Sequence, residues 1–254
     1  MSAAVSPSPD AVDRFGPLLG EARLGLEFAA LVADAGLHPP RRQPGAPPVL
    51  LVPGFMAGDA SLFVLRSWLA MRGHRIAMSG IKVNVDCAER ALTRLQEQLR
   101  TFASSSGEAV IVIGQSRGGM LARCLAVREP DLVAGLVTLG SPVLDQLAVS
   151  APVLRMVRSV AMLASLGVPG TFSRRCADGE CCEPFRRDLV ATLPAGLTTA
   201  IYSRSDGIVD WRACLDPDAE QVEVSSSHCG MAVNAEVYRV LERVLVADRE
   251  LRSL

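Results

Sequence analysis

Aromatic residues and net charge are both scarce in this sequence. Aromatic side chains make up only 4% of the 254 residues, whereas hydrophobic residues make up 49%. The core must therefore consist mainly of Ala, Val, Leu and Ile. The 26 basic and 27 acidic residues give a formal charge of −1, which leaves no overall electrostatic field to recruit nucleic acid or an anionic membrane. We expect a small-molecule partner that is neutral or apolar, and no nucleic acid.

The sequence also lacks a long uninterrupted hydrophobic run. The most apolar window, at residues 151–170, contains Pro152, Arg155 and Arg158, so it is too short and too charged for a transmembrane helix. The first residues show neither the basic start nor the apolar stretch of a secretory signal. Seven cysteines, an odd number, suit a reducing compartment. These features predict a cytoplasmic protein, with export as the alternative.

One domain is expected at residues 18–254, preceded by a disordered segment at residues 1–17. After a proline-rich connector, strand and helix patterns alternate along the chain. The strands are predicted at residues 49–54, 74–80, 109–114, 134–142, 197–203 and 220–225. This order predicts an α/β fold with a mostly parallel sheet flanked by helices. In such sheets ligands bind beyond the carboxyl ends of the strands.

Three helices carry signals of how they begin or pack. Asp86 and Glu89 have the spacing of a capping box, and Asn234 is in position to cap the last helix. A first helix, ending at Gly36, is predicted from the helical spacing of Leu24, Phe28, Leu31 and Val32.

A serine lies between glycines where a predicted strand meets a predicted helix. Residues 114–118, Gly-Gln-Ser-Arg-Gly, match G-x-S-x-G, with "VIVI" before them and "MLARCLAV" shortly after. Side chains at Gly114 and Gly118 would collide with neighbouring elements, and the tight turn would lift the Ser116 hydroxyl clear of the sheet. We therefore predict that Ser116 is a nucleophile. The alternative is a loop serine that caps a helix.

A nucleophilic serine needs a base, and the chain has only three histidines. His38 and His74 are interpreted as solvated loop residues. His228 follows the last predicted strand and is therefore expected at the same sheet edge as Ser116.

The histidine in turn needs a carboxylate, and two aspartates follow the strand at 197–203. Asp206 comes first and precedes a glycine, so it is favoured over Asp210. The reaction also needs two donors for an oxyanion. The N–H groups of Arg117 and Phe55 are the candidates, although residues 54–59 would also suit an ordinary strand-to-helix turn.

Several motifs together resemble the α/β-hydrolase superfamily, and within it the bacterial esterases and triacylglycerol lipases. They are "LLVPGF", "GQSRGG", "TLGSP", "IYSRSDGIVDW" and "SSSHCGM", spanning Val49 to Val233. The resemblance implies a serine carboxylic-ester hydrolase that forms an acyl-enzyme and needs neither metal nor cofactor. It assigns nucleophile, acid, base and the two oxyanion donors to Ser116, Asp206, His228, Phe55 and Arg117.

The motifs depart from the family pattern at two positions. Many of these lipases have His before the glycine of the oxyanion loop, where this chain has Pro53. That change removes a side chain that often braces the loop. Arg117 stands where a hydrophobic residue or Gln is usual, which weakens any assignment of the substrate by analogy.

A cap or lid insertion is expected at about residues 143–196, where this superfamily places its lid. Its predicted helix has a broad apolar surface formed by Val153, Leu154, Val157, Val160, Ala161, Leu163 and Ala164. The surface either packs on the core or lines an acyl pocket, and a displaced cap would allow transient contact with lipid.

Cys176, Cys181 and Cys182 lie close together in this insertion. Reduced thiols without a special role are the favoured interpretation, because zinc would need a fourth ligand and no histidine is near. A disulfide is the alternative for an exported protein. Cys87, Cys124 and Cys214 are expected to be packing residues, and Cys229 to make the protein sensitive to thiol reagents.

The sequence thus favours an esterase or lipase acting on esters with an apolar acyl or alcohol group. An acyltransferase or thioesterase using the same three residues remains open, because the acceptor depends on pocket shape. A non-catalytic lipid-binding protein on the same scaffold is the third possibility.

Overall fold

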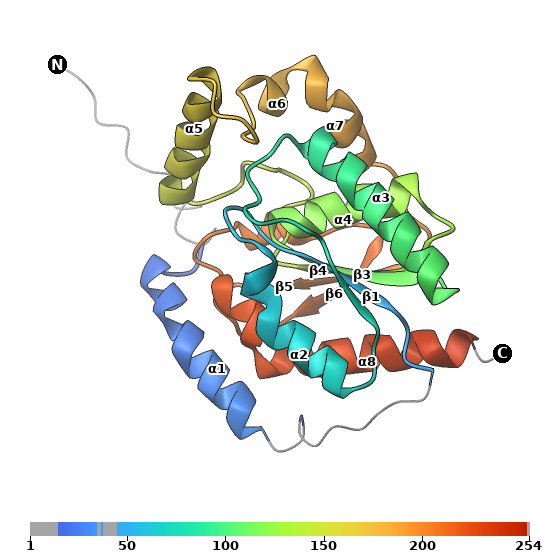
Figure 1. Cartoon of the computed structure of the whole chain (residues 1–254). Coiled ribbons are helices and arrows are strands. Elements are labelled where there is room, and N and C mark those ends of the chain that lie inside the picture. The colour runs from blue at the N-terminus through green and yellow to red at the C-terminus, as the bar shows by residue number, and fades with distance from the viewer. Residues whose placement is uncertain (1–14, 35–36, 38–44, 253–254) are drawn as a thin grey trace.

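The computed structural model describes residues 15–34, 37 and 45–252. At its centre lies a six-stranded sheet (Figure 1). The strands are β1 (Val49–Val52), β2 (Ile76–Met78), β3 (Val110–Gln115), β4 (Val133–Leu139), β5 (Thr198–Tyr202) and β6 (Ala219–Glu223). They lie in the order β2-β1-β3-β4-β5-β6, and every neighbouring pair is parallel. The predicted parallel sheet is confirmed.

Helices cover both faces of this sheet. The helices α3 (Ala88–Ser106) and α4 (Arg117–Arg128) lie on one face, and α1 (Leu24–Ala33), α2 (Phe63–Met71) and α8 (Ala235–Arg252) lie on the other (Figure 1). Alternate residues of β3 enter the two resulting cores: Val110 and Val112 pack with α3 and α4, whereas Ile111 and Ile113 pack with α2 and α8. A strand covered on both sides is buried along its whole length, as β1 and β3 are.

Three further helices follow β4 and precede β5. They are α5 (Ala151–Ser165), α6 (Arg175–Asp178) and α7 (Glu183–Leu189). Figure 1 shows α5 and α6 on the side of the molecule away from α8. The described residues also form short 3-10 helices: η2 (Leu18–Arg23), η3 (Asp59–Leu62), η4 (Glu180–Cys182), η5 (Trp211–Cys214) and η6 (Cys229–Val233). None of the described helices combines the length and apolar composition needed to cross a bilayer.

The first helix packs differently from the prediction. It begins at Leu24, and the residues that it buries are Glu27 and Leu31. Leu24, Phe28 and Val32 are largely exposed instead. The predicted helix is confirmed, but Leu31 alone of the four apolar residues is buried, and the Glu27 carboxylate takes an inward position because it finds hydrogen-bond donors there. Gly36, the predicted helix end, lies outside the described residues.

Two other local predictions also need correction. The carboxylate of Asp86 does accept the Cys87 N–H, but it pairs mainly with Arg90 and Arg94, and α3 begins at Ala88 without a side-chain cap. The predicted capping box is therefore wrong, because the arginines offer Asp86 a charged partner. The disorder predicted for residues 1–17 does not hold for residues 15–17, since the Gly16 N–H donates to the Asp206 carbonyl at 2.7 Å. Residues 1–14 lie outside the described part.

The prediction for the last helix is confirmed. The side-chain oxygen of Asn234 accepts the backbone N–H of Glu236 at 2.9 Å and that of Val237 at 3.4 Å, which satisfies two amides at the start of α8. The helix then buries Val237 and Leu241 against the sheet.

Candidate active site

Ser116 occupies a strained turn between β3 and α4. Its φ of 52° and ψ of −123° lie outside the regions that residues with side chains favour, at a cost of about 1–3 kcal/mol. A Cβ on Gly114 would lie 2.5 Å from the Gly118 carbonyl oxygen, and one on Gly118 would lie 2.3 Å from the Val52 carbonyl oxygen. The glycines are therefore required by the close approach of α4 to β3 and β1.

The loop after β1 lies directly beside this turn. A Cβ on Gly54 would come within 3.3 Å of the Ser116 Cβ. The backbone N–H groups of Phe55 and Arg117 have no acceptor within the described part of the chain. Apart from Ser116, only Met56 among the described non-glycine residues has a positive φ, so backbone strain is concentrated around the site.

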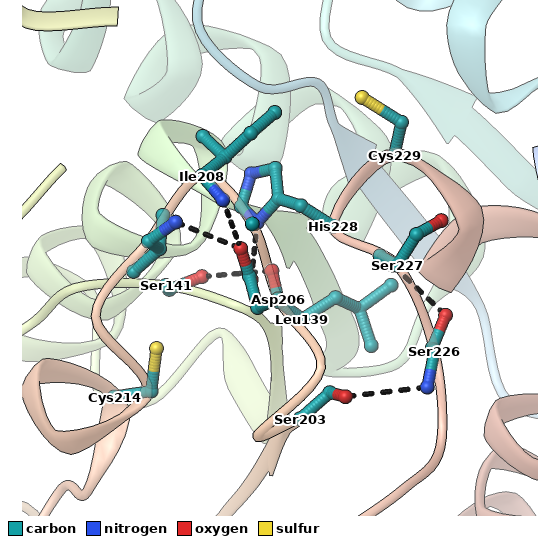
Figure 2. A network of polar contacts seen from close by, with 12 residues as sticks. Leu139, Ser141, Ser203, Asp206, Ile208, Cys214, Ser226, Ser227, His228 and Cys229 are labelled. Carbon is teal, nitrogen blue, oxygen red and sulfur yellow. Dashed lines mark hydrogen bonds and ion pairs between the residues drawn. The ribbon is translucent and has the colours of Figure 1, made fainter. Parts of the chain in front are cut away.

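The ring of His228 pairs with the carboxylate of Asp206. Nδ1 of His228 lies 2.6 Å from Oδ2 of Asp206, and both side chains are buried (Figure 2). The other carboxylate oxygen accepts the N–H groups of Ile208 at 2.8 Å and Val209 at 2.7 Å. Because an ionised carboxylate can only accept, Nδ1 carries the proton, and Nε2 of His228 remains available as an acceptor.

Burial and charge act in opposite directions on His228. Burial disfavours the imidazolium, but the charge of Asp206, its hydrogen bond and the charge of Glu21 outweigh that effect and raise the pKa of His228 above its ordinary value. The protonated form of the ring is thus stabilised where it lies.

Ser116 and His228 share one cavity of about 880 Å³. Both line its wall, together with Phe55 and Arg117. No hydrogen bond involves the Ser116 hydroxyl in the described part of the chain. The structure therefore brings the four sequence-predicted residues to one cavity, with Asp206 behind His228.

The other candidates do not join this group. Asp210 accepts the Arg212 N–H at 3.1 Å and so caps η5. His74 is buried, not solvated as predicted, because its Nδ1 hydrogen-bonds the Pro47 carbonyl at 2.8 Å. Burial lowers the pKa of His74 despite that bond. His38 lies outside the described residues.

Comparison with known proteins agrees with this topology. A family model described as the alpha/beta hydrolase fold matches residues 94–173. The solved structure of the Bacillus licheniformis lipase BlEst2 in mature form is similar, with a TM-score of 0.57 and 16% identity over 82% of this chain and 94% of that chain. The chain has the α/β-hydrolase fold.

Other enzymes with this fold are similar to a comparable degree. A soluble variant of monoglyceride lipase from Saccharomyces cerevisiae has a TM-score of 0.54 and 12% identity, over 81% of this chain and 85% of that chain. The thioesterase domain from the curacin biosynthetic pathway has a TM-score of 0.52 and 14% identity, over 80% of this chain and 92% of that domain. No curated protein matches the chain in sequence.

Two glutamates support the site of this α/β-hydrolase fold from the N-terminal segment. Glu21 accepts the N–H groups of Gly207, His228 and Cys229. Glu27 accepts the Ser227 N–H at 2.8 Å and the hydroxyl of a neighbouring serine at 2.9 Å. Sequence reasoning missed both. The signal for Glu27 was a single carboxylate within the apolar run "LGLEFAALVA".

Asn84 braces the loop that carries Phe55. Its amide nitrogen donates to the Pro53 carbonyl at 2.8 Å, and its backbone exchanges hydrogen bonds with Met56 and Ala57. Asn84 thus holds this loop, which contains Pro53, from the segment between β2 and α3. No local pattern around Asn84 predicts that role.

The Arg117 side chain contacts the segment between β2 and α3 and an aromatic ring of the insertion. Its guanidinium donates to the Asn84 side-chain oxygen at 3.1 Å and to the Asp86 carbonyl at 2.6 Å, and lies 5.1 Å from the centre of the Phe172 ring. Arg117 thereby connects the site to the segment between β4 and β5. The partners of this guanidinium are thus two oxygen acceptors and an aromatic face.

The seven cysteines divide into three that lie apart from the others, Cys124, Cys214 and Cys229, and four that lie together, Cys87, Cys176, Cys181 and Cys182. Cys124 and Cys214 are buried packing residues, as predicted, and Cys229 is exposed beside His228. Cys87 is also buried, but its sulfur lies 3.4 Å from that of Cys182. The interpretation of Cys87 as a packing residue is therefore incomplete, since the fold brings it to the cysteines of the insertion.

Proposed function

We propose that this chain is a serine carboxylic-ester hydrolase for esters with an apolar acyl or alcohol group. The observation that carries the proposal is the single cavity whose wall holds both the strained Ser116 and the Asp206-paired ring of His228. A hydroxyl on such a turn, beside two free backbone donors, suits acyl transfer.

The reaction follows from the positions of these groups. Nε2 of His228 takes the Ser116 proton as the hydroxyl oxygen attacks the ester carbonyl carbon, for which the hydroxyl must come within hydrogen-bond reach of the ring. The N–H groups of Phe55 and Arg117 stabilise the oxyanion. His228 then protonates the leaving alcohol. Water, activated by the same ring, releases the acid from the acyl-enzyme.

The cavity lining supports an apolar substrate group. Its walls include six apolar side chains from five segments: Met120, Val143, Val153, Val157, Phe172 and Leu189. Four of these come from residues 151–190, so the insertion acts as a cap over the cavity. A volume of about 880 Å³ accommodates a group well beyond an acetyl, since pockets for drug-sized ligands span roughly 300–1,000 Å³.

The decisive experiment is covalent labelling by a fluorophosphonate probe. The folded wild type is expected to carry one adduct, on Ser116, and Ser116→Ala is expected to carry none. The same variant should lose turnover of p-nitrophenyl esters by a factor on the order of 10⁴ or more, with an unchanged circular dichroism spectrum. Ser105→Ala, on the exposed side of α3, is the matched control. An unlabelled Ser116 in folded protein would overturn the proposal.

A substrate series then defines the reaction class. Rates on p-nitrophenyl esters of increasing acyl length should rise as the chain fills the cap, and rates above the solubility limit report any activation by a lipid surface. Acyl-thioester analogues and a competing alcohol test the thioesterase and acyltransferase alternatives on the same serine. Binding of lipid without turnover would favour the non-catalytic alternative.

A further inference from the structure

The fold gathers four cysteines from two distant parts of the sequence. Cys87 directly precedes α3, whereas Cys176 lies in α6 and Cys181 and Cys182 lie in η4. All four sulfur atoms lie within 4.8 Å of one another. The sequence had seemed to lack a fourth ligand for the three cysteines of the insertion, and Cys87 supplies it from 95 residues before Cys182.

We propose that these four cysteines, hereafter the cysteine cluster, bind one Zn²⁺ ion as thiolates. In a tetrahedral site with Zn–S bonds of about 2.3 Å, the sulfur atoms lie about 3.8 Å apart. The measured separations are 3.4 Å between Cys87 and Cys182, 3.7 Å between Cys176 and Cys181, and 3.9 Å between Cys181 and Cys182. A multi-iron cluster would hold some of the sulfurs farther apart, because its four cysteines are shared among two or more metal atoms.

The electrostatic surroundings suit a thiolate site. The guanidinium of Arg117 donates at 2.6 Å to the carbonyl of Asp86, the residue directly before Cys87. Arg90, three residues after Cys87, pairs with the Asp86 carboxylate at 2.5 Å. Two arginines thus lie next to Cys87 in sequence or contact, where four thiolates and one divalent ion would carry a net charge of −2.

Zinc binds cysteine as the thiolate, so the protons of the four thiols leave as the ion binds. Since all four positions are taken by protein sulfurs, the ion has no open position and its role is structural.

The site would fasten the cap to the body of the fold. Cys87 is anchored to the α3 side of the sheet, and the other three ligands belong to the insertion. Phe172 and Cys176 line the cavity, and Arg117 bridges from the Ser116 turn to Phe172. The inference does not depend on ester hydrolysis, because its test measures bound metal.

The test is a metal analysis of the full chain, purified under nitrogen with a phosphine reductant after growth with added zinc. Mass spectrometry of the metals is expected to find one zinc per chain. Replacing the zinc with Co²⁺ should give the strong visible and near-ultraviolet absorption of a tetrahedral cobalt–thiolate site. Competition with a chromophoric chelator should show zinc binding at least about 10-fold weaker in Cys176→Ser and in Cys181→Ser.

Cys229→Ser is the matched control, because Cys229 is exposed like Cys181 but lies outside the cysteine cluster. It should retain one zinc per chain. Metal-free wild type that takes up neither zinc nor cobalt would overturn the proposal, as would iron in place of zinc. Disulfides among the four residues despite the reductant, or full zinc content in both cluster variants, would also overturn it. The cobalt titration of the wild type decides the matter even where a variant fails to fold.

Discussion

The carboxylate of Glu21 binds the backbone of His228 across 207 residues of sequence. Its Oε1 accepts the N–H of His228 at 2.9 Å and that of Gly207 at 3.0 Å, and its Oε2 accepts the N–H of Cys229 at 3.0 Å. Gly207 follows Asp206, so one carboxylate joins the loops of the candidate acid and the candidate base. Glu21 is also one of the charges that raise the pKa of His228.

Removing the Glu21 carboxylate should reduce catalysis without abolishing it. We expect Glu21→Ala to lower kcat/KM by about 10- to 100-fold, mainly through kcat, because three amides lose their acceptor and the ring shifts relative to Ser116. Glu21→Gln keeps one acceptor oxygen but loses the charge, so the midpoint of the acid limb of kcat/KM should move to lower pH.

The measurement is the pH profile of kcat and KM for both variants, beside Glu97→Gln, an exposed substitution on α3 as control. A merely structural role for Glu21 would lower the rate without moving the midpoint. If Glu21→Gln kept the midpoint of the wild type, its charge would not act on His228.

The pH dependence of kcat/KM in the wild type follows from the charges of Asp206 and Glu21 beside His228. Only the neutral imidazole can take the Ser116 proton, so kcat/KM should fall as the pH drops through the pKa of His228. Burial lowers that pKa, but Asp206 and Glu21 raise it further, so half-maximal kcat/KM is expected above the ordinary value of about 6.5. A midpoint below that value, measured with a non-ionising ester, would contradict this account.

The raised pKa of His228 makes the stability of the fold change with pH in the direction opposite to activity. A folded-state pKa above the unfolded value stabilises the fold fully below the unfolded pKa, and this contribution is lost as the pH rises through the folded pKa. Activity should therefore rise over the same pH range in which this contribution to the free energy of unfolding disappears. Urea unfolding of the wild type and of His228→Gln across that range measures the difference.

The parts of the site that the sequence predicts are those with a local pattern. The Ser116 turn is visible because two glycines at fixed spacing separate a β-branched run from a helix, and the physical reason is the close backbone approach at Gly114 and Gly118. The parallel sheet likewise follows from the alternation of strands and helices. Asp206 and His228 could be chosen because parallel strands end at one sheet edge.

The supports of the site have no such pattern. Glu21, Asn84 and Cys87 act through contacts with segments that lie far away in sequence, and nothing beside them indicates the partner. Helical periodicity locates the first helix but does not show that α1 buries Glu27 against donors from the His228 loop, because the rule assumes that apolar residues face inward. Polar contacts between segments this far apart in sequence can be recognised only once the fold is known.

The two aspartates after β5 offer a direct comparison of roles. Asp206→Asn should lower kcat by a factor on the order of 10⁴, because the amide cannot hold the His228 ring in the required tautomer. Asp210→Asn should change kcat by less than about 3-fold, since Asp210 caps η5 and does not contact the ring. Steady-state kinetics on one p-nitrophenyl ester compares them, and similar losses in both variants would refute the assignment.

The pair of Arg123 and Asp216 is a test of stability away from the site. The Nε of Arg123 lies 2.6 Å from Oδ2 of Asp216, and the two side chains are only 3% and 1% exposed. The pair ties α4 to the turn before β6. Arg123 also pairs with Asp218 at 3.2 Å, but the Asp218 side chain is 22% exposed. Asp216→Asn removes the closer and more buried of these two carboxylates, so it should lower the free energy of unfolding by up to about 3–5 kcal/mol.

Thermal and urea unfolding measure this loss. Glu220→Gln is the control, because Glu220 pairs with Arg243 at 3.0 Å while both side chains remain 58% exposed, and an exposed pair contributes less than about 1 kcal/mol. The double variant Arg123→Met with Asp216→Leu should recover part of the stability that Asp216→Asn loses, because it leaves no charge at either of the two most buried positions, and Asp218 remains partly exposed. A double variant no more stable than the single one would mean that the geometry of the pair, and not the unpaired charge, accounts for the loss.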